Sequence, residues 1–371
     1  MIKHLFSELR SLFTIKGIFI IFYGLPLAIF IRIISKIFLI RIMKINSERI
    51  GELIINPAIY LYQKENNINK VSKYCLDIFF FKTDPINTQI CKMLKREINI
   101  YPNYLIEPIY EAQKKISYLI KNQEKYSPLK KRRFKFHYID KLPCSKKNIN
   151  FLFDEKNKGK KELFEKFGVG ENDKFVCFLV RDQEFLKKLY PGSDFSSHEY
   201  RNIKISNFIE AAKALSKRGY YVFRMGKFQE KSFNTEDPKI IDYANSEFRS
   251  DFLDIYLSAH CKFFLTTMSG LDNLLPIFNI PTIVIPLNLA IARQYKNYLI
   301  STKVFVNEHN EKVSLKELFE KDLIFRQKKE DFDKAKIKPI DPTSSQIHKL
   351  VIEMDDHIIN GKKYNQEEEE L

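Results

Sequence analysis

Short apolar runs alternate with amphipathic segments in the part of the chain that begins at residue 38. The runs 38–45 (FLIRIMKI) and 75–81 (CLDIFFF) predict strands, whereas 49–63 and 87–96, with apolar residues three or four positions apart, predict helices. A further helix is expected within 108–137, running into basic coil. Strands that alternate with helices are typical of a parallel sheet.

The second half of the chain repeats this alternation more regularly. Apolar runs of buried-strand type and the helices between them are expected in the following order: strand 175–182, helix 205–218, strand 220–226, short strand 239–244, helix 251–260, strand 261–267, short helix 271–278 and strand 280–287. This order predicts a doubly wound α/β domain.

The length of 371 residues suits two domains, and the change of domain is expected between residues 140 and 172. The predicted fold is α/β, with two Rossmann-like domains behind an amphipathic helical membrane anchor. The expected parts are a membrane-associated helical segment 1–37, a first Rossmann-like domain 38–150, a second Rossmann-like domain 151–340, and a C-terminal helix with an acidic tail 341–371.

The formal net charge of +16 is compatible with a nucleic acid, an anionic membrane or phosphorylated substrates as partner. Residues 1–45 carry seven Lys or Arg against the single acid Glu8, interleaved with apolar stretches, which favours an anionic membrane surface. A second basic cluster, 130–133, is expected to be a solvated connection. No helix-turn-helix, zinc or RNP pattern accompanies the charge, so no nucleic-acid partner is expected.

Residues 17–31 contain no charge, but fifteen helical residues span only about 22 Å. A bilayer core needs about 20 apolar residues, and Pro26 should kink the helix. We therefore expect an anchor lying in or re-entering the cytoplasmic face of the inner membrane rather than a span. The alternative is a pair of core helices packed within the protein. No small-residue cleavage site follows the run, which disfavours a signal peptide.

The five cysteines are scattered, without a C-x-x-C pair, and Cys177 and Cys261 lie in or beside apolar runs. This spacing disfavours disulfides and zinc sites, and it places the body of the protein in a reducing cytoplasm.

Candidate binding residues follow the predicted strands of the second domain, because open parallel sheets bind ligands at the carboxyl ends of their strands. Ser269 and Gly270 lie before a predicted helix, whose free N–H groups and positive dipole end suit a diphosphate. Asp272 and Asn273 in the first turn alternatively serve as capping groups.

Three arginines at or near strand ends, Arg181, Arg201 and Arg224, are expected to neutralise the diphosphate with their planar guanidinium groups. Asn202 and Gly226 stand beside them in sequence and complete the predicted binding set. Each arginine alternatively forms an ordinary surface ion pair.

Asp182 and His198 are candidates for proton transfer, although a lone histidine in a loop is more often structural. In the first domain, Glu52 follows Gly51 at the start of a predicted helix and is the candidate general base; the alternative is a carboxylate that simply complements the helix dipole. No D-x-D motif occurs at a suitable place, and the pair 355–356 lies in the predicted C-terminal helix, so no metal site is expected.

Several fragments resemble a family of GT-B glycosyltransferases encoded in bacterial O-antigen and capsule gene clusters: RIGELIINPAIYLY, HEYRNI, YYVFRMGK, KIIDYA and SDFLDIYLSAHCKFFLTTMSGLDNLLPIFNIPTIVI. The match covers most of 40–290. The chain also resembles fucosyltransferase-like GT-B enzymes at Arg181, Asp251-Phe252, Cys261 and Ser269. Where members of the first family often carry histidine, this chain has Glu52.

The resemblance implies transfer of a sugar from a nucleotide sugar, expected to be a UDP- or GDP-sugar, to a lipid-linked glycan, with no separate cofactor. A noncatalytic, membrane-recruited scaffold of a polysaccharide assembly complex is the alternative from another class. Phosphoryl transfer of the P-loop type is disfavoured, because the chain has no G-x-x-x-x-G-K-[ST] motif.

Overall fold

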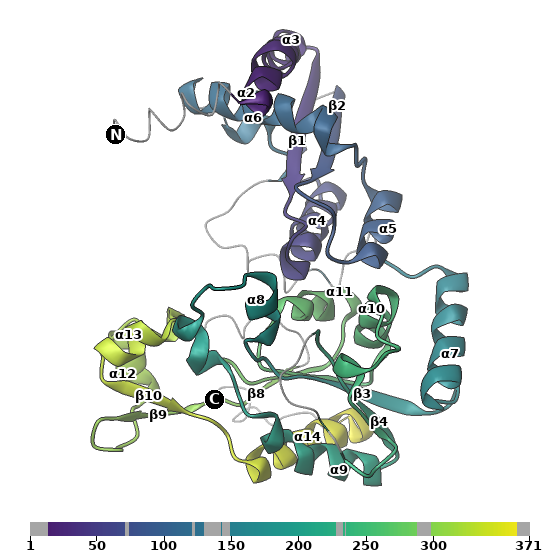
Figure 1. The fold of residues 1–371 in the computed structure, drawn as a ribbon, viewed down its shortest axis with the longest axis vertical. Coiled ribbons are helices and arrows are strands. Elements are labelled where there is room, and N and C mark those ends of the chain that lie inside the picture. The colour runs from purple at the N-terminus through teal and green to yellow at the C-terminus, as the bar shows by residue number, and fades with distance from the viewer. Residues whose placement is uncertain are drawn as a thin grey trace. The chain divides into compact units, whose positions relative to one another are not determined.

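A computed structural model describes residues 14–70, 74–120, 123–129, 142, 149–227, 233, 235–287 and 298–361 (Figure 1). Residues 1–13, the basic cluster 130–133 and the acidic run 367–370 lie outside this part. The chain divides into two compact units, residues 1–150 (unit 1) and 151–371 (unit 2), which are described separately.

Unit 1 is built on a βαβ arrangement. Strands β1 (Phe38–Ile45) and β2 (Tyr74–Phe81) pair in parallel, and helix α4 (Ile50–Glu65) connects them. Helix α5 (Thr88–Glu97) follows, and a parallel bridge joins Phe79 to Ile100. The predicted strands and helices are present, but the described residues of unit 1 form a two-stranded sheet, smaller than the Rossmann-like sheet expected from the sequence.

The apolar N-terminal region is helical in three consecutive pieces, α2 (Ile15–Phe19), the π-helical turn η1 (Ile20–Gly24) and α3 (Leu25–Ile34). In the π turn the N–H of Leu25 donates to the carbonyl of Ile20. The irregularity lies just before Pro26, which has no N–H to continue the α-helical pattern. The stretch Gly17–Ile34 is long and apolar enough to cross a membrane, and 22% of it is buried.

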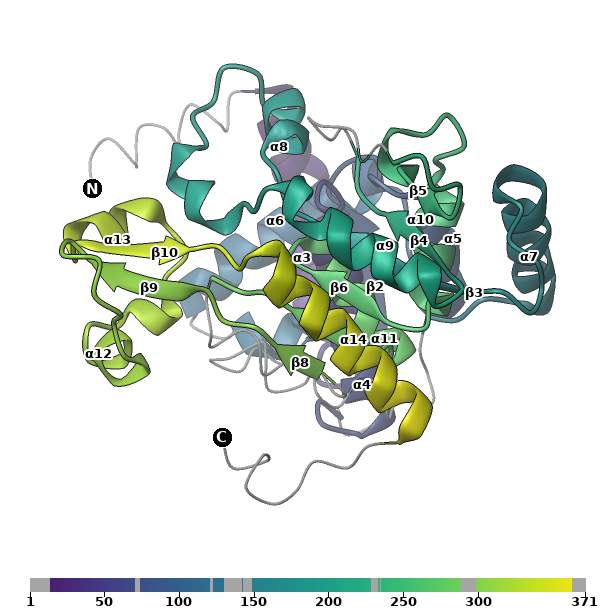
Figure 2. The same cartoon turned by 90° about the horizontal axis from the view of Figure 1, so that it is seen from below.

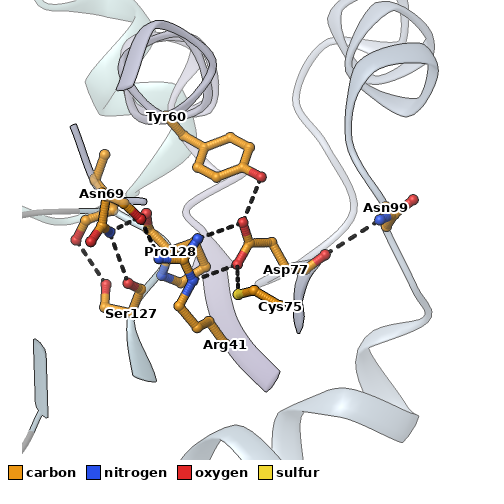
Figure 3. Close-up of polar contacts among 9 residues, drawn as sticks. Arg41, Tyr60, Asn69, Cys75, Asp77, Asn99, Ser127 and Pro128 are labelled. Atoms are coloured by element: carbon orange, nitrogen blue, oxygen red, sulfur yellow. Dashed lines mark hydrogen bonds and ion pairs between the residues drawn. The ribbon is translucent and has the colours of Figure 1, made fainter. Parts of the chain in front are cut away.

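A buried polar network connects β1, β2 and α4 of unit 1 (Figure 3). Arg41 on β1 donates from Nε and Nη2 to the two carboxylate oxygens of Asp77 on β2, at 2.6 and 2.8 Å. Tyr60 on α4 donates to Asp77 at 2.8 Å, and Arg41 Nη1 donates to the carbonyl of Asn69. Arg41 therefore faces the interior, and the expectation that it belongs to an amphipathic membrane face is wrong.

The Asp77 carboxylate also affects an exposed thiol. Burial, followed by the charge of Asp77, raises the pKa of Cys75 to about 11. The same two causes raise the pKa of Tyr60, whose hydroxyl therefore stays protonated. The network is a satisfied structural element, with a donor for each carboxylate oxygen.

Unit 2 contains a six-stranded, fully parallel sheet in the order β5-β4-β3-β6-β7-β8. The strands are β3 (Lys174–Leu179), β4 (Tyr220–Arg224), β5 (Ile240–Ile241), β6 (Phe264–Thr266), β7 (Thr282–Val284) and β8 (Tyr298–Ile300). The first strand in sequence is central; the chain builds outward in one direction, returns, and builds outward in the other. This is the Rossmann order, and it is compatible with the doubly wound α/β domain that the sequence predicted.

Helices cover both faces of this sheet. On one face α9 (Ile209–Lys217) and α14 (Ser344–Asn360) lie side by side and share a core with alternate residues of the central strands (Figure 2). The other face is covered by α10 (Asp251–His260), where the carbonyl of Leu257 accepts a hydrogen bond from the thiol of Cys177 on β3. The pair Asp355-Asp356 lies in α14, where both carboxylates bind Arg218 at the end of α9.

The remaining elements of the chain are short, apart from two longer helices. They are α6 (Asn103–Ile120), η2 (Gln123–Tyr126), α7 (Phe153–Phe167), α8 (Glu184–Leu189), η4 (Ser196–Arg201), η5 (Ile205–Phe208), η6 (Tyr243–Asn245), η7 (Gly270–Leu274), α11 (Leu275–Phe278), β9 (Val304–Asn307), α12 (Leu315–Glu320), η9 (Leu323–Phe325), α13 (Lys329–Lys334) and β10 (Ile337–Ile340).

Two of these short elements were not expected from the sequence. The first is α8, between the predicted strand 175–182 and the predicted helix 205–218, where the N–H of Glu184 donates to Asp182. The antiparallel pair β9 and β10 was not expected, because its strands are four residues long and lie about 30 residues apart in sequence. Such brief strands carry little periodicity.

Candidate functional site

The candidate site lies at the topological switch point of the unit 2 sheet, between β3 and β6, where the strand order reverses. Ligands of open parallel sheets bind at the carboxyl ends of the strands beside such a point. Here the chain leaves β3 into Arg181 and leaves β6 into Thr267. The two exits are joined directly, since the backbone N–H of Arg181 donates to Thr267 Oγ1 at 2.8 Å and that of Thr267 donates to the carbonyl of Leu179.

An open cavity of about 1290 Å³ lies at these strand ends, entirely within unit 2. Its wall includes four of the predicted residues, Arg181, Asp182, Asn202 and Arg224. The rest comes mainly from the segment 192–207, which contains η4 and η5, and from β10, with Lys187 of α8 and Lys303. A volume above the usual 300 to 1,000 Å³ of small-molecule pockets leaves room for a ligand as large as a nucleotide sugar.

Two guanidinium groups meet at the switch point without a compensating carboxylate in contact. Burial and, after it, the charge of Arg201 lower the pKa of Arg181 to about 10. Burial is also the main cause that lowers the pKa of Arg201. Among the described residues, neither guanidinium has a carboxylate within 4 Å, and Arg201 Nη2 donates to the carbonyl of Met268 at 3.3 Å. Two like charges in a partly dry crevice favour an anionic ligand.

Three polar atoms around this crevice are buried and have no hydrogen-bond partner within the described structure: Arg181 Nε, His198 Nδ1 and Asn202 Oδ1. Buried polar atoms are nearly always satisfied, so such a cluster indicates groups that bind something else. Burial and then the charges of Arg201 and Arg181 lower the pKa of His198. The imidazole is thus neutral at pH 7 and able to donate or accept a proton.

The loop after β6 is held in a strained form by a buried carboxyl. Asp272 accepts from the N–H of Ser269 at 2.7 Å and from the hydroxyl of Thr266 at 2.9 Å. Between them Met268 has a φ of +69°, which is rare for a side chain of this size. Burial raises the pKa of Asp272 to about 7, although Arg201 and Arg181 oppose the shift. Asp272 therefore both holds the loop conformation through its hydrogen bonds and interacts electrostatically with Arg181 and Arg201.

The raised pKa of Asp272 predicts a pH-dependent contribution to stability. Because the folded-state pKa lies above that of an unfolded aspartate, the contribution is fully present below about pH 4 and is lost as pH rises through about 7, by at most about 1.4 kcal/mol per pH unit. We expect the stability difference between the native chain and Asp272→Asn to shrink from pH 5 to about pH 7 and to level off above it in thermal unfolding.

Asp194→Asn is the matched control for this experiment. The pKa of Asp194 is lowered by its hydrogen bonds from the backbone and side chain of Ser196, so the carboxylate stays ionised throughout this range. Its difference from the native chain should be flat. A flat difference for Asp272→Asn as well would contradict the assignment.

The turn η4, which carries His198 and Arg201, is fixed by residues that the sequence did not single out. The buried ammonium of Lys303 donates to the carbonyls of Tyr200 and Asn202 and to Asp341, at 2.8, 3.3 and 2.6 Å. Tyr200 also donates to Asp333 of α13 at 2.7 Å. Burial lowers the pKa of Lys303. Lys303 follows the short strand β8, whose three residues gave no clear strand pattern.

Other predicted residues have structural partners. Arg224 lies 3.5 Å from both oxygens of Asp242, and burial is the main cause that lowers its pKa. Gly226 has a φ of +138°, which favours glycine, and its carbonyl accepts from Arg249. The N–H of Ser269 is taken by Asp272, which is the capping alternative, and η7 and α11 are only five and four residues long.

The helix-dipole argument for Ser269 and Gly270 is therefore weakened, and their role with a diphosphate stays a prediction. Glu52 belongs to unit 1, in the first turn of α4, where it accepts from Asn46 Nδ2. Within the described ranges no three His, Cys, Asp or Glu side chains gather where they could hold a metal ion.

Comparison with known proteins gives structural likeness alone. No family model and no curated protein matches the chain. A glycosyl transferase family 9 protein from Veillonella parvula is 11% identical, with 87% of this chain and 97% of that chain covered and a TM-score of 0.46. The Escherichia coli ADP-heptose lipopolysaccharide heptosyltransferase II is 10% identical over 87% and 100% of the two chains, also with a TM-score of 0.46. At these values the likeness carries no conclusion about substrate or reaction.

Proposed function

We propose that this chain is a glycosyltransferase of the GT-B type that binds the diphosphate of a nucleotide sugar in the crevice at Arg181 and Arg201. The observation that carries the proposal is a pair of partly buried guanidiniums, without contacting carboxylates, at the switch point of a Rossmann-ordered sheet. The unpartnered atoms of Arg181, His198 and Asn202 add ligand-directed groups at the same place.

The proposed reaction needs what this crevice supplies. When the sugar C1 leaves the diphosphate oxygen for an acceptor hydroxyl, negative charge grows on the departing nucleoside diphosphate. Arg181 and Arg201 stabilise that charge without a metal ion, because planar guanidiniums bind phosphate oxygens bidentately. The acceptor hydroxyl loses its proton to a general base, for which Glu52, Asp182 and His198 remain the candidates.

The proposed acceptor is a lipid-linked glycan of a surface polysaccharide at the cytoplasmic face of the inner membrane. The apolar helical region Gly17–Ile34 in unit 1, followed by the exposed Lys36, supports a location at a lipid surface. The expected donor is a UDP- or GDP-sugar. The nucleotide-binding experiment described next tests which base the donor carries.

Thermal unfolding of the full-length, detergent-solubilised chain with UDP, GDP, CDP, dTDP and CMP, each with and without Mg²⁺, tests the proposal. We expect one nucleoside diphosphate to raise the unfolding temperature without Mg²⁺; at a hundredfold excess over its Kd it adds about 2.7 kcal/mol of stability. The matching monophosphate should add less, since the crevice recognises the diphosphate. If no nucleotide raised the unfolding temperature, the donor-site assignment would be overturned and the noncatalytic scaffold would be favoured.

A further inference from the structure

Two neighbouring helices of unit 1 leave large apolar side chains in solvent. On the N-terminal helical region these are Ile15, Ile18, Phe19, Phe22, Ile29, Phe30 and Ile33, with Phe22 77% exposed. On and beside α6 they are Tyr101, Tyr104, Leu105, Tyr118, Leu119 and Ile120, with Leu119 79% exposed. Isolated apolar residues are common on surfaces, but a set of this size marks an interaction face.

The two helices form one packed element, with α2, α3 and α6 gathered at the same end of unit 1 (Figure 1). Gly24 lies so close to α6 that a Cβ there would be 2.3 Å from the carbonyl oxygen of Pro108. Eight residues further on, Arg32 donates to Gln113 Oε1 at 3.0 Å and to Ser117 Oγ at 2.6 Å. The contacts advance together along both helices, so α3 and α6 run parallel.

This packing argues against a transmembrane span. One side of the apolar helix is occupied by α6, and Arg32 is turned toward α6 and lies over the ring of Tyr126 at 4.4 Å. Helix α6 itself carries Glu107, Glu111, Lys114 and Lys115 within 18 residues, so it cannot enter the hydrocarbon core. A helical region packed against such a partner from η1 through α3 is expected to lie in the plane of the interface.

Charge identifies the occupant of the face. Residues 14–45 contain no acid, but of their five basic side chains Arg41 binds Asp77, Lys44 binds Glu111 and Arg32 is turned toward α6, so these three do not charge the face. Lys36 is exposed beyond the end of α3, and the side chain of Lys114 on α6 is 63% exposed. The exposed tyrosines belong to the residue type that prefers the boundary between lipid headgroups and acyl chains. A basic, tyrosine-bearing apolar face complements an anionic bilayer surface.

We propose that unit 1 docks in the plane of an anionic bilayer through a face made jointly by the helical region 15–34 and by α6, with both ends of α6 taking part. This deepens only the membrane part of the proposed function and needs neither a donor nor turnover. The inference therefore stands or fails independently of sugar transfer.

The chain contains no tryptophan, so single substitutions give clean fluorescent reporters. The full-length variants Phe22→Trp, Leu119→Trp and Phe319→Trp are to be diluted from detergent into vesicles of phosphatidylglycerol and phosphatidylcholine with bromine at shallow or deep acyl positions. Phe319, on α12 of unit 2, is the control because it is 62% exposed and lies outside the proposed face.

We expect the emission of Trp reporters at positions 22 and 119 to shift to the blue and to be quenched at least twofold more strongly by shallow than by deep bromines, while the reporter at 319 is unaffected. Vesicles of phosphatidylcholine alone should bind at least tenfold more weakly. Deep quenching at 22 with none at 119 would mean a lone spanning helix, and no quenching at either would mean that protein covers the face; both results overturn the proposal.

Discussion

Replacing Arg181 with alanine should weaken nucleoside diphosphate binding about 10- to 150-fold while leaving the unfolding temperature of the ligand-free chain unchanged or raised. A hydrogen bond to a charged group contributes about 1.5 to 3 kcal/mol, which corresponds to this range of affinity. Removal of one of two repelling, partly buried cations relieves the ligand-free protein rather than harming it, because burial and the charge of Arg201 outweigh the attraction of Arg181 to Asp182 and Asp272. Isothermal titration with the nucleotide that stabilises the native chain measures the effect.

Two further variants make this result specific. Arg326→Ala removes an arginine that binds Asp322 on the surface of the same unit, so nucleotide affinity should stay within twofold of the native value. Arg181→Lys keeps the charge and loses the planar fork, and we expect an intermediate loss. Equal affinities for the native chain and Arg181→Ala would remove the diphosphate from this crevice.

Replacing Asp77 with alanine should destabilise unit 1 by about 3 to 5 kcal/mol, because it leaves the buried Arg41 guanidinium without its bidentate partner. The side chains of Arg41 and Asp77 are 8% and 11% exposed, so water cannot substitute for the lost carboxylate. Tyr60 loses its acceptor at the same time (Figure 3). Hydrogen exchange of peptides covering β1 and β2 in the full-length chain measures the free energy of local opening.

The exposed ion pair between Glu48 and Lys82 supplies the control within unit 1. Both side chains are about 40% exposed, at 38% and 41%, so Glu48→Ala should cost less than about 1 kcal/mol. The double variant Arg41→Met/Asp77→Leu removes both charges and should recover most of the loss. A single Asp77→Ala variant as stable as Glu48→Ala would show that the network does not hold the sheet together.

The sequence indicated where ligand-directed residues should lie, because parallel strands end at a common edge. Arg181, Asp182 and Arg224 lie at the carboxyl ends of two predicted strands, and all three line one cavity. The sequence could not show which of these side chains already bind a partner within the protein and which can bind a ligand. Arg224 has Asp242 at 3.5 Å and the N–H of Ser269 is held by Asp272, whereas no carboxylate of the described residues lies within 4 Å of the Arg181 guanidinium. Such pairings depend on contacts between residues far apart in the chain.

Local periodicity determined the elements of this protein: the parallel strands and their helices, and the apolar character of 17–31, follow from side-chain spacing that each segment carries alone. Only the tertiary structure decided the sheet order that places β3 beside β6, the turn of Arg32 toward α6, and the burial of Arg41 against Asp77. The physical reason is that a charged side chain is as compatible with a membrane face as with a buried pair until a partner distant in sequence reaches it, because the cost of burial depends on that partner.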